Sequence, residues 1–486
     1  MLEDLIQERL KKREALIDAG KNPYPAKVKR DHDIRTLLRK FLFWSLIKKE
    51  ISVAGRILGK RAQGGVMFLD LKDESGKIQV VANKKQVAEF SLFKDNLDIG
   101  DFISVTGTLF KTKKGERSVN ASELTIATKT LHPLPATWYG FHDEEERLRK
   151  RYLDILFNPE IKDMIEKKAK FWNATRSFLM NHGFLEVETP VLEVTPGGAD
   201  ARPFMTHHNA LDIDVSLRIS MGELWQKKLM VAGFEKTFEI GRQFRNEGMD
   251  AEHLQDYTQM EFYWAYADYE MGMKLVEELF RHIAMEAFGT HQFKIGEFQI
   301  DLNKKWELYD YRETVKKYTG IDILNTNLPE MQAKLEALKI HYDKKGFNVT
   351  RAIDNLWKYC RRQIAGPGFL TGVPVEVSPL AKKDVTNPKL TQRFQVILAG
   401  SELGNGYSEL NDPVDQEERF NEQMKLREAG DEEAQLKDMD FVEALQYGMP
   451  PTCGFGMSER VFSFLMNKSA RDCQIFPLMR PRKEQE

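Results

Sequence analysis

The sequence predicts an α+β protein built from two domains. The chain has 486 residues, more than one hydrophobic core usually serves, so two or more domains are expected. Short runs of strand-like composition with glycine-bearing turns fill residues 51–131. Beyond residue 138 helical segments alternate with strand-like runs in no regular βαβ order, which favours an antiparallel sheet flanked by helices over a doubly wound sheet.

The first predicted domain, residues 1–137, begins with an amphipathic helix that Gly20 ends, followed by five strands. The predicted strands are residues 51–61, 65–73, 77–84, 101–112 and 123–131. A helical segment lies between the third and fourth strands, which is the order of an OB-fold β-barrel, a fold that commonly binds oligonucleotides. A small barrel that serves only for dimerisation would show the same pattern, so that alternative stays open.

A linker is predicted over residues 138–165, with the boundary near Trp138. Two prolines precede it and a dense run of charged residues follows, as is typical of a connection between domains. Residues 166–486 are the predicted second domain, and a polar helical stretch at about 303–374 is expected to be an insertion in it.

Charge and cysteine content exclude several protein classes. The 72 basic and 74 acidic residues nearly cancel, so any contact with nucleic acid must come from local patches. The cysteines, Cys360, Cys453 and Cys473, have no CxxC spacing, which argues against a zinc site and favours a reducing compartment. The longest apolar run is far short of the ~20 residues of a membrane span, and no signal peptide is visible, so we expect a cytoplasmic protein.

The segment 238–269, FEIGRQFRNEGMDAEHLQDYTQMEFYWAYADY, predicts a hairpin with two different faces. Side chains alternate along a strand, so one apolar face is expected from Phe238, Ile240 and Phe244 and from Met260, Phe262, Trp264 and Tyr266. The odd-numbered face is polar and aromatic, and its members should converge on one surface: Arg245, Glu247, Tyr257, Glu261 and Tyr263. A half-exposed sheet with cross-strand ion pairs would give the same pattern, so parity alone does not decide.

A second polar-aromatic strand is predicted in GSELGNGYSELND, where Asn405, Tyr407 and Glu409 share a face. Its glycines let a ligand approach closely, although a plain glycine-rich edge strand is an equal alternative. The chain has no GxxxxGK[ST] loop, no GxGxxG after a strand and no HExxH, so P-loop ATPases, Rossmann enzymes and zinc proteases lose their usual support.

Three segments, in order along the chain, resemble the signature motifs of class II aminoacyl-tRNA synthetases. HGFLEVETPVL resembles motif 1, with Pro190 at the proline of the dimer interface. FEIGRQFRNEG resembles motif 2, whose arginine and glutamate would be Arg245 and Glu247, and GFGMSERVF is similar to motif 3, whose arginine would be Arg460. Further segments, among them PGGADARPFMTHHNALD, VEVSPLAK and FPLMRP, are similar to the bacterial lysyl-tRNA synthetases.

The resemblance implies an OB-fold that binds the anticodon of tRNA(Lys) and a catalytic domain that activates L-lysine with ATP. It also implies Mg²⁺ as cofactor and a homodimer formed through the motif 1 region around Pro190. Matching positions assign an anticodon-stacking ring to Phe68 and base-reading groups to Gln79 and Glu116. Phe68 as part of the barrel core is the alternative.

The resemblance also implies the active-site roles. Arg245 would bind the α-phosphate of ATP, with Glu247, His253 and Tyr257 near the nucleotide and Arg460 at its far end. Arg245, Glu247 and Arg460 would be the catalytic residues. Glu402 would bind Mg²⁺, together with Gln395 at the position of the usual second carboxylate. The implied lysine-binding residues are Gly198, Glu223, Glu261, Tyr263, Asn405, Tyr407 and Glu409.

Residue chemistry independently favours lysine as the substrate. A pocket for an ε-ammonium group needs carboxylates and neutral hydrogen-bonding groups, which Glu261 and Glu409 with Tyr263 and Tyr407 supply. A pocket for aspartate would need arginine or lysine at those positions.

Three features depart from the family pattern. Glu252 stands where the motif 2 loop usually carries arginine, Gln395 replaces a magnesium-binding carboxylate, and motif 3 is one residue short with Glu459 before Arg460. Two alternatives to a lysine-tRNA ligase therefore stay open. One is a divergent tRNA-binding paralogue with weakened activation, and the other is a class II ligase for another amino acid.

Overall fold

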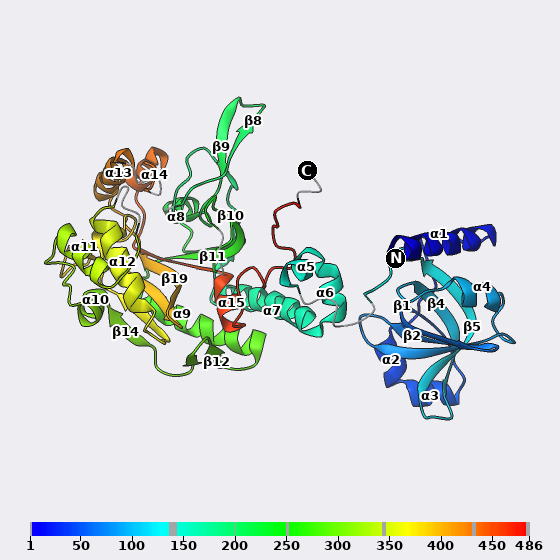
Figure 1. The fold of residues 1–486 in the computed structure, drawn as a ribbon. Coiled ribbons are helices and arrows are strands. Elements are labelled where there is room, and N and C mark those ends of the chain that lie inside the picture. Colours follow the sequence, from blue (N-terminus) through cyan, green and yellow to red (C-terminus); the bar gives the residue numbers. More distant parts are fainter. Residues whose placement is uncertain are drawn as a thin grey trace. The chain divides into compact units, whose positions relative to one another are not determined.

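The computed structural model describes residues 2–135, 143–199, 201–248, 252–342, 347–429 and 434–482. The chain divides into two compact units, Met1–His142 and Asp143–Glu486, which are considered separately (Figure 1). None of the helices in the described ranges combines the length and the apolar composition needed to cross a membrane.

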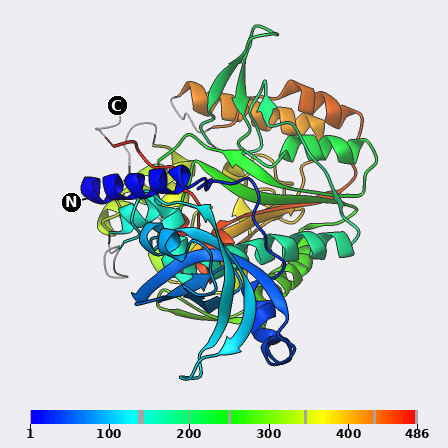
Figure 2. The same ribbon diagram turned by 90° about the vertical axis from the view of Figure 1, so that its right-hand side faces the viewer.

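The first unit is a closed five-stranded barrel in the order β1-β2-β3-β5-β4, whose strands curve round into a wall in Figure 2. Helix α4 lies between β3 and β4 in the chain, so the expected OB-fold is confirmed. The elements are α1 (Leu2–Asp18), α2 (Ile34–Arg39), α3 (Phe41–Leu46), β1 (Glu50–Gln63), β2 (Val66–Lys72), β3 (Lys77–Asn83), α4 (Phe90–Asn96), β4 (Phe102–Lys111) and β5 (Arg117–Thr128).

Strand β2 shows how the barrel separates its two faces. Met67, Leu69 and Leu71 are fully buried in the core, as a period of two requires. Phe68 points to the other side and is half-buried, so the alternative that Phe68 belongs to the barrel core is wrong.

The second unit is organised around an eight-stranded sheet in the order β14-β15-β18-β19-β20-β11-β10-β6. The five central pairings are antiparallel, as expected, but β14 pairs with β15 and β6 pairs with β10 in parallel. Both parallel pairings follow from long crossovers, through α10 to α12 in one case and through residues 187–235 in the other. The sheet is therefore mixed at its two edges.

Helices cover the two faces of this sheet (Figure 1). On one face α7 and α9 pack on the apolar side chains of the strands, where Phe171 and Leu279 meet Phe238, Met260 and Phe262. On the other face α8, α13 and α14 pack beside β11. Side chains at the N-caps begin several of these helices; that of Asp268 accepts a hydrogen bond from the amide of Met271.

The remaining elements connect and extend the sheet. They are α5 (Glu144–Arg149), α6 (Arg151–Phe157), α7 (Pro159–Asn181), β6 (Leu185–Glu186), β7 (Leu192–Glu193), β8 (Met205–His208), β9 (Ile213–Leu217), α8 (Glu223–Val231), β10 (Lys236–Phe244), β11 (Asp256–Ala265), α9 (Tyr269–Ile283), η2 (Ala284–Phe288), β12 (Gln292–Ile295), β13 (Phe298–Asp301), β14 (Glu307–Asp310), α10 (Tyr311–Thr319), α11 (Leu328–Ala337), α12 (Val349–Arg361), β15 (Gly368–Thr371), β16 (Val373–Pro374), η3 (Val375–Val377), β17 (Leu390–Thr391), β18 (Arg393–Leu398), β19 (Ser401–Ser408), α13 (Pro413–Glu428), α14 (Met439–Gln446), β20 (Thr452–Ser458) and α15 (Arg460–Leu465).

The structure of two segments differs from what their composition predicts. Residues 143–165, expected within a linker, form α5, α6 and the start of α7; Trp138 lies outside the described residues. Arg151 anchors this region because its buried guanidinium contacts Asp154 and the carbonyl oxygen of Asp472. The stretch 303–374, expected as an insertion, holds α10 to α12 but also β14 and β15 of the main sheet.

Candidate active site

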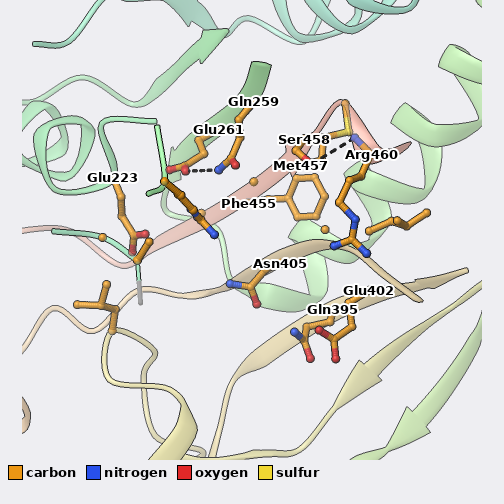
Figure 3. A pocket seen from close by; sticks show the side chains of 18 of the residues that line it. Glu223, Gln259, Glu261, Gln395, Glu402, Asn405, Phe455, Met457, Ser458 and Arg460 are labelled. Atoms are coloured by element: carbon orange, nitrogen blue, oxygen red, sulfur yellow. Dashed lines mark hydrogen bonds between the residues drawn. The ribbon is translucent and has the colours of Figure 1, made fainter. Parts of the chain in front are cut away.

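A cavity of about 390 Å³ opens on the polar face of the large sheet. Figure 3 shows Glu223 and Glu261 at one end, Gln395, Glu402 and Arg460 at the other, and Asn405 between them. All the candidate residues of the second unit line this cavity: Gly198, Glu223, Arg245, Glu247, His253, Tyr257, Glu261, Tyr263, Gln395, Glu402, Asn405, Tyr407, Glu409 and Arg460.

The β10–β11 hairpin has the two faces that parity predicts. Phe238 pairs with Phe262 and Ile240 with Met260, and these side chains face the core. Tyr257, Glu261 and Tyr263 face the cavity instead. The convergence expected of the odd-numbered residues is therefore confirmed in the structure.

Two glycines of β20 make room for the cavity above the centre of the sheet. Gly456 lies between Glu261 and Asn405, and Gly454 lies next to Tyr263. A Cβ atom at Gly454 would lie 2.1 Å from Oε1 of Glu409 and 2.8 Å from the Tyr263 ring. Any side chain at Gly454 would therefore fill the space between these polar groups.

A β-bulge in β19 brings two residues to the cavity that would lie on opposite faces of a regular strand. Ile397 of β18 pairs with Glu402 of β19, and Gln395 of β18 pairs with Asn405 of β19. The two residues of β18 are two positions apart, whereas their partners in β19 are three positions apart. The extra residue in β19 shifts the alternation, so Glu402 and Asn405 both reach the lining. Sequence parity cannot show such a bulge.

Glu261 is a buried carboxylate held in place by hydrogen bonds. It accepts hydrogen bonds from the amide of Met221 (3.0 Å), Nε2 of Gln259 (2.6 Å) and the hydroxyl of Tyr263 (3.0 Å). Burial, reinforced by repulsion from Glu223, raises the pKa of Glu261 to about 7.

Glu409 and Glu223 share one internal cation, Lys227, which the sequence did not reveal as part of the site. The fully buried Nζ of Lys227 lies 2.9 Å from Glu223 and 2.6 Å from Glu409. Burial opposes the charge of Lys227, but the two carboxylates outweigh it and raise its pKa. Burial also raises the pKa of Glu409 to about 8, despite the attraction of Lys227. The spacing of four residues from Glu223 to Lys227 was the available signal.

This end of the cavity therefore holds more buried carboxyl groups than buried cations. Glu223, Glu261 and Glu409 face one buried lysine, and Oε1 of Glu409 accepts no hydrogen bond from any described residue. The hydroxyl of Tyr407 donates to Glu223 and adds no charge. A cationic ligand with several hydrogen-bond donors matches this arrangement.

The opposite end presents arginines. The guanidinium of Arg245 lies 5.9 Å from the centre of the Tyr257 ring, and its Nε donates to the carbonyl oxygen of Ile219 at 3.2 Å. Arg460 reaches the same end from the start of α15 and donates to Glu252 and to Oγ of Ser401. This end therefore suits an anionic ligand with an aromatic part.

Comparison with known proteins decides between the families that could use such a cavity. Residues 143–480 match the family described as "tRNA synthetases class II (D, K and N)", and residues 51–127 match the "OB-fold nucleic acid binding domain". The lysine-tRNA ligases of Roseiflexus sp. (strain RS-1) and Bacillus subtilis (strain 168) are each 43% identical to the chain. The alignments cover 99% of this chain and 99% and 98% of those proteins, respectively. The chain belongs to the lysine-tRNA ligase family of class II tRNA synthetases.

The motifs that suggested this family all lie at structured positions of the synthetase domain. Arg245 and Glu247 follow β10, Arg460 begins α15, and Pro190 lies between β6 and β7. The amide of Arg202 donates to Glu247 at 3.3 Å. The expected resemblance to class II lysyl-tRNA synthetases is thereby confirmed.

Gln395 and Glu402 present side-chain oxygen atoms to the Mg²⁺ that this family implies. They lie side by side on β18 and β19 (Figure 3). Glu402 also accepts a hydrogen bond from Nε1 of Trp357. Among the described residues no group of three or more His, Cys, Asp or Glu could hold a metal alone. One carboxylate and one amide oxygen fit Mg²⁺ that is completed by phosphate and water.

The three anticodon candidates lie on neighbouring parts of the barrel. Phe68 is on β2, Gln79 on β3 and Glu116 in the connection that precedes β5, in line with the barrel order β2-β3-β5. The guanidinium of Arg61 lies 5.9 Å from the centre of the Phe68 ring. Oε1 of Gln79 accepts a hydrogen bond from Ser118 at 3.0 Å, and Glu116 is exposed.

The raised pKa of Glu261 predicts a pH effect on stability. The folded protein binds more protons than the unfolded chain between the ordinary pKa of 4.5 and about 7, so the contribution of this group to stability is lost as pH rises through that range. The loss should be on the order of 3 kcal/mol. Urea unfolding at pH 5 and pH 8 should show it as a difference between the wild type and Glu261→Gln.

The exposed carboxylate of Glu278 on α9 offers a matched control. Glu278→Gln should keep the wild-type dependence on pH. Equal pH dependence in the wild type and Glu261→Gln would show that the buried carboxylate does not resist ionisation.

Proposed function

We propose that this chain is a lysine-tRNA ligase. It activates L-lysine with ATP to lysyl-adenylate and pyrophosphate, and then transfers lysine to the 3′ end of tRNA(Lys). The observation that carries this proposal is the excess of buried carboxylate at one end of the cavity, where Glu261 and Glu409 suit an ε-ammonium group. Similarity over the whole chain to lysine-tRNA ligases supports it. The three cysteines are free and buried, which supports a reducing cytoplasm as its location.

The two ends of the cavity bring the reactants into line. The lysine side chain lies among Glu223, Glu261 and Glu409, and its α-carboxylate attacks the α-phosphorus of ATP while pyrophosphate leaves. Arg245 neutralises charge on the α-phosphate, so catalysis comes from positioning and electrostatic stabilisation rather than from a protein nucleophile. Arg460 holds the far end of ATP.

The neighbouring groups complete substrate binding. Tyr257 packs against adenine, with Glu247 and His253 beside the nucleotide. Mg²⁺ bound through Glu402 and Gln395 would neutralise charge on the leaving pyrophosphate. The lysine end is also lined by Gly198, Tyr263, Asn405 and Tyr407. A Cβ atom at Gly198 would lie 2.5 Å from Oγ of Ser220, so this position has room only for glycine.

Glu252 and Gln395 motivate a second candidate, a tRNA-binding paralogue with weakened activation. Each makes the nucleotide end differ from the family pattern. A ligase for another amino acid is disfavoured by the carboxylates around the lysine end. Lysine-dependent exchange of pyrophosphate into ATP, run beside all other amino acids, separates the three.

Glu261→Gln should raise the KM for lysine about ten- to hundredfold in this exchange assay, since it removes a charged acceptor worth about 1.5–3 kcal/mol. The KM for ATP should stay the same, because Glu261 lies at the other end of the cavity. Glu278→Gln is the control. An unchanged KM for lysine would exclude Glu261 from the pocket, and no exchange with the folded wild type would exclude the ligase.

We infer that the outer face of the barrel binds the anticodon through Phe68, Gln79 and Glu116. Phe68→Ala should lower kcat/KM for tRNA(Lys) about ten- to hundredfold, because stacking on an aromatic ring contributes about 1–3 kcal/mol per base. Pyrophosphate exchange should not change. The guanidinium of Arg56 lies 4.3 Å from the centre of the Phe102 ring on β4, so Phe102→Ala is a matched control. Equal effects of the two variants would contradict the assignment.

We infer a homodimer through the motif 1 region around Pro190. Large apolar side chains are exposed around it, among them Leu185, Leu192, Met205 and Val194, which is 73% exposed. Exposed apolar side chains that gather on one surface typically mark a protein interface. Sedimentation at micromolar concentration should show a dimer that Val194→Asp weakens. A monomeric wild type would contradict this interface.

A further inference from the structure

Glu252 and Arg460 form an ion pair across the nucleotide end of the cavity. Nη2 of Arg460 donates to Oε2 of Glu252, although the two residues are 208 positions apart in the chain. Ser401 joins them: its Oγ accepts a hydrogen bond from Arg460 at 2.7 Å and donates to Glu252 at 3.2 Å. Three separate segments therefore meet at this pair.

The Glu252–Arg460 pair affects how much positive charge the cavity can offer to an anionic ligand. Among its described lining residues seven are glutamates, whereas three are arginines: Arg245, Arg393 and Arg460. Arg393 is held by Oδ1 of Asn405 at 2.7 Å and by Oγ of Ser378 at 3.0 Å. Arg245 and Arg460 are therefore the side chains that can offer positive charge to a triphosphate at this end, and Glu252 already neutralises Arg460.

The pair is also weak enough for a ligand to break. The side chains of Arg460 and Glu252 are 22% and 42% exposed, and such partly exposed pairs contribute about 1 kcal/mol or less. Phosphate oxygens make charge-assisted hydrogen bonds of the same kind with more than one negative charge. Nε of Arg460 is buried and donates to no described residue, so the guanidinium retains an unused donor.

We propose that Glu252 is a counter-ion that the triphosphate of ATP displaces from Arg460, and that it thereby sets the ATP affinity of the site. The proposal rests on the proposed function, because it takes the ligand at this end to be ATP. In the ATP-free protein Glu252 holds Arg460 in place. ATP takes over the guanidinium at the cost of that pair and of repulsion from the released carboxylate.

Equilibrium dialysis of labelled ATP, at fixed Mg²⁺ and without lysine, tests this directly. Glu252→Gln removes the charge and keeps the size, so the Kd for ATP should fall about three- to tenfold. Glu252→Ala should shift it in the same direction. Asp256 of β11 pairs with Arg242 at 2.6 Å, outside the cavity lining, so Asp256→Asn removes one charge from the same hairpin and should leave the Kd within about twofold.

A double-mutant cycle separates the specific pair from a general effect of charge. In an Arg460→Gln background, Glu252→Gln should tighten ATP binding less than in the wild type, because only the repulsion between Glu252 and the triphosphate remains to be removed. An unchanged or higher Kd in both Glu252 variants, or an equal gain in the Arg460→Gln background, would overturn the proposal. Absence of lysine-dependent exchange in the wild type would instead refute the proposed function, and the two failures are thus distinguishable.

Discussion

Buried carboxylates that lack a matching number of cations are the constraint on which this active site depends. Glu223, Glu261 and Glu409 are buried together with a single lysine, Lys227. Ionised groups withdrawn from water are costly unless they are paired, so the protein without ligand answers by raising the pKa of Glu261 and Glu409. A ligand ammonium group relieves this cost, which makes the site selective for a cation.

The fold maintains this arrangement by covering the opposite face of the same strands with a large apolar core. Phe238, Met260 and Phe262 are fully buried against α7 and α9, which fixes the direction of the alternate side chains. Gly454 and Gly456 leave the space that a ligand needs above the central strand. The end with the buried carboxylates and the end with the arginines thus belong to one cavity on the polar face of the sheet.

Much of the fold and of the active site could be predicted from the sequence, because both follow in large part from local rules. Parity placed Tyr257, Glu261 and Tyr263 on one face, and motif resemblance identified the family. Contacts between distant segments could not be predicted in this way. Lys227 joins the site by folding beside Glu409, and Glu239, which shares the polar parity, pairs with Arg218 at 2.6 Å instead of lining the cavity.

The bulge in β19 and the helices at residues 143–165 illustrate two further limits. Pairing with β18, and not the sequence of β19 itself, brings Glu402 and Asn405 to the same side. The charged residues after residue 143 resemble a linker in composition, yet Arg151 and Asp154 bury their charges against each other. Composition reports an average, whereas a few long-range pairs decide the structure of such segments.

We infer that the buried carboxylates select the ε-ammonium group of the substrate. Competition between L-lysine and L-norleucine, which keeps the aliphatic chain of lysine and lacks its terminal ammonium group, tests this selection in the exchange assay. We expect that norleucine neither supports exchange nor inhibits it at concentrations where lysine saturates. Inhibition by norleucine at concentrations similar to the KM for lysine would show that shape, and not charge, governs recognition.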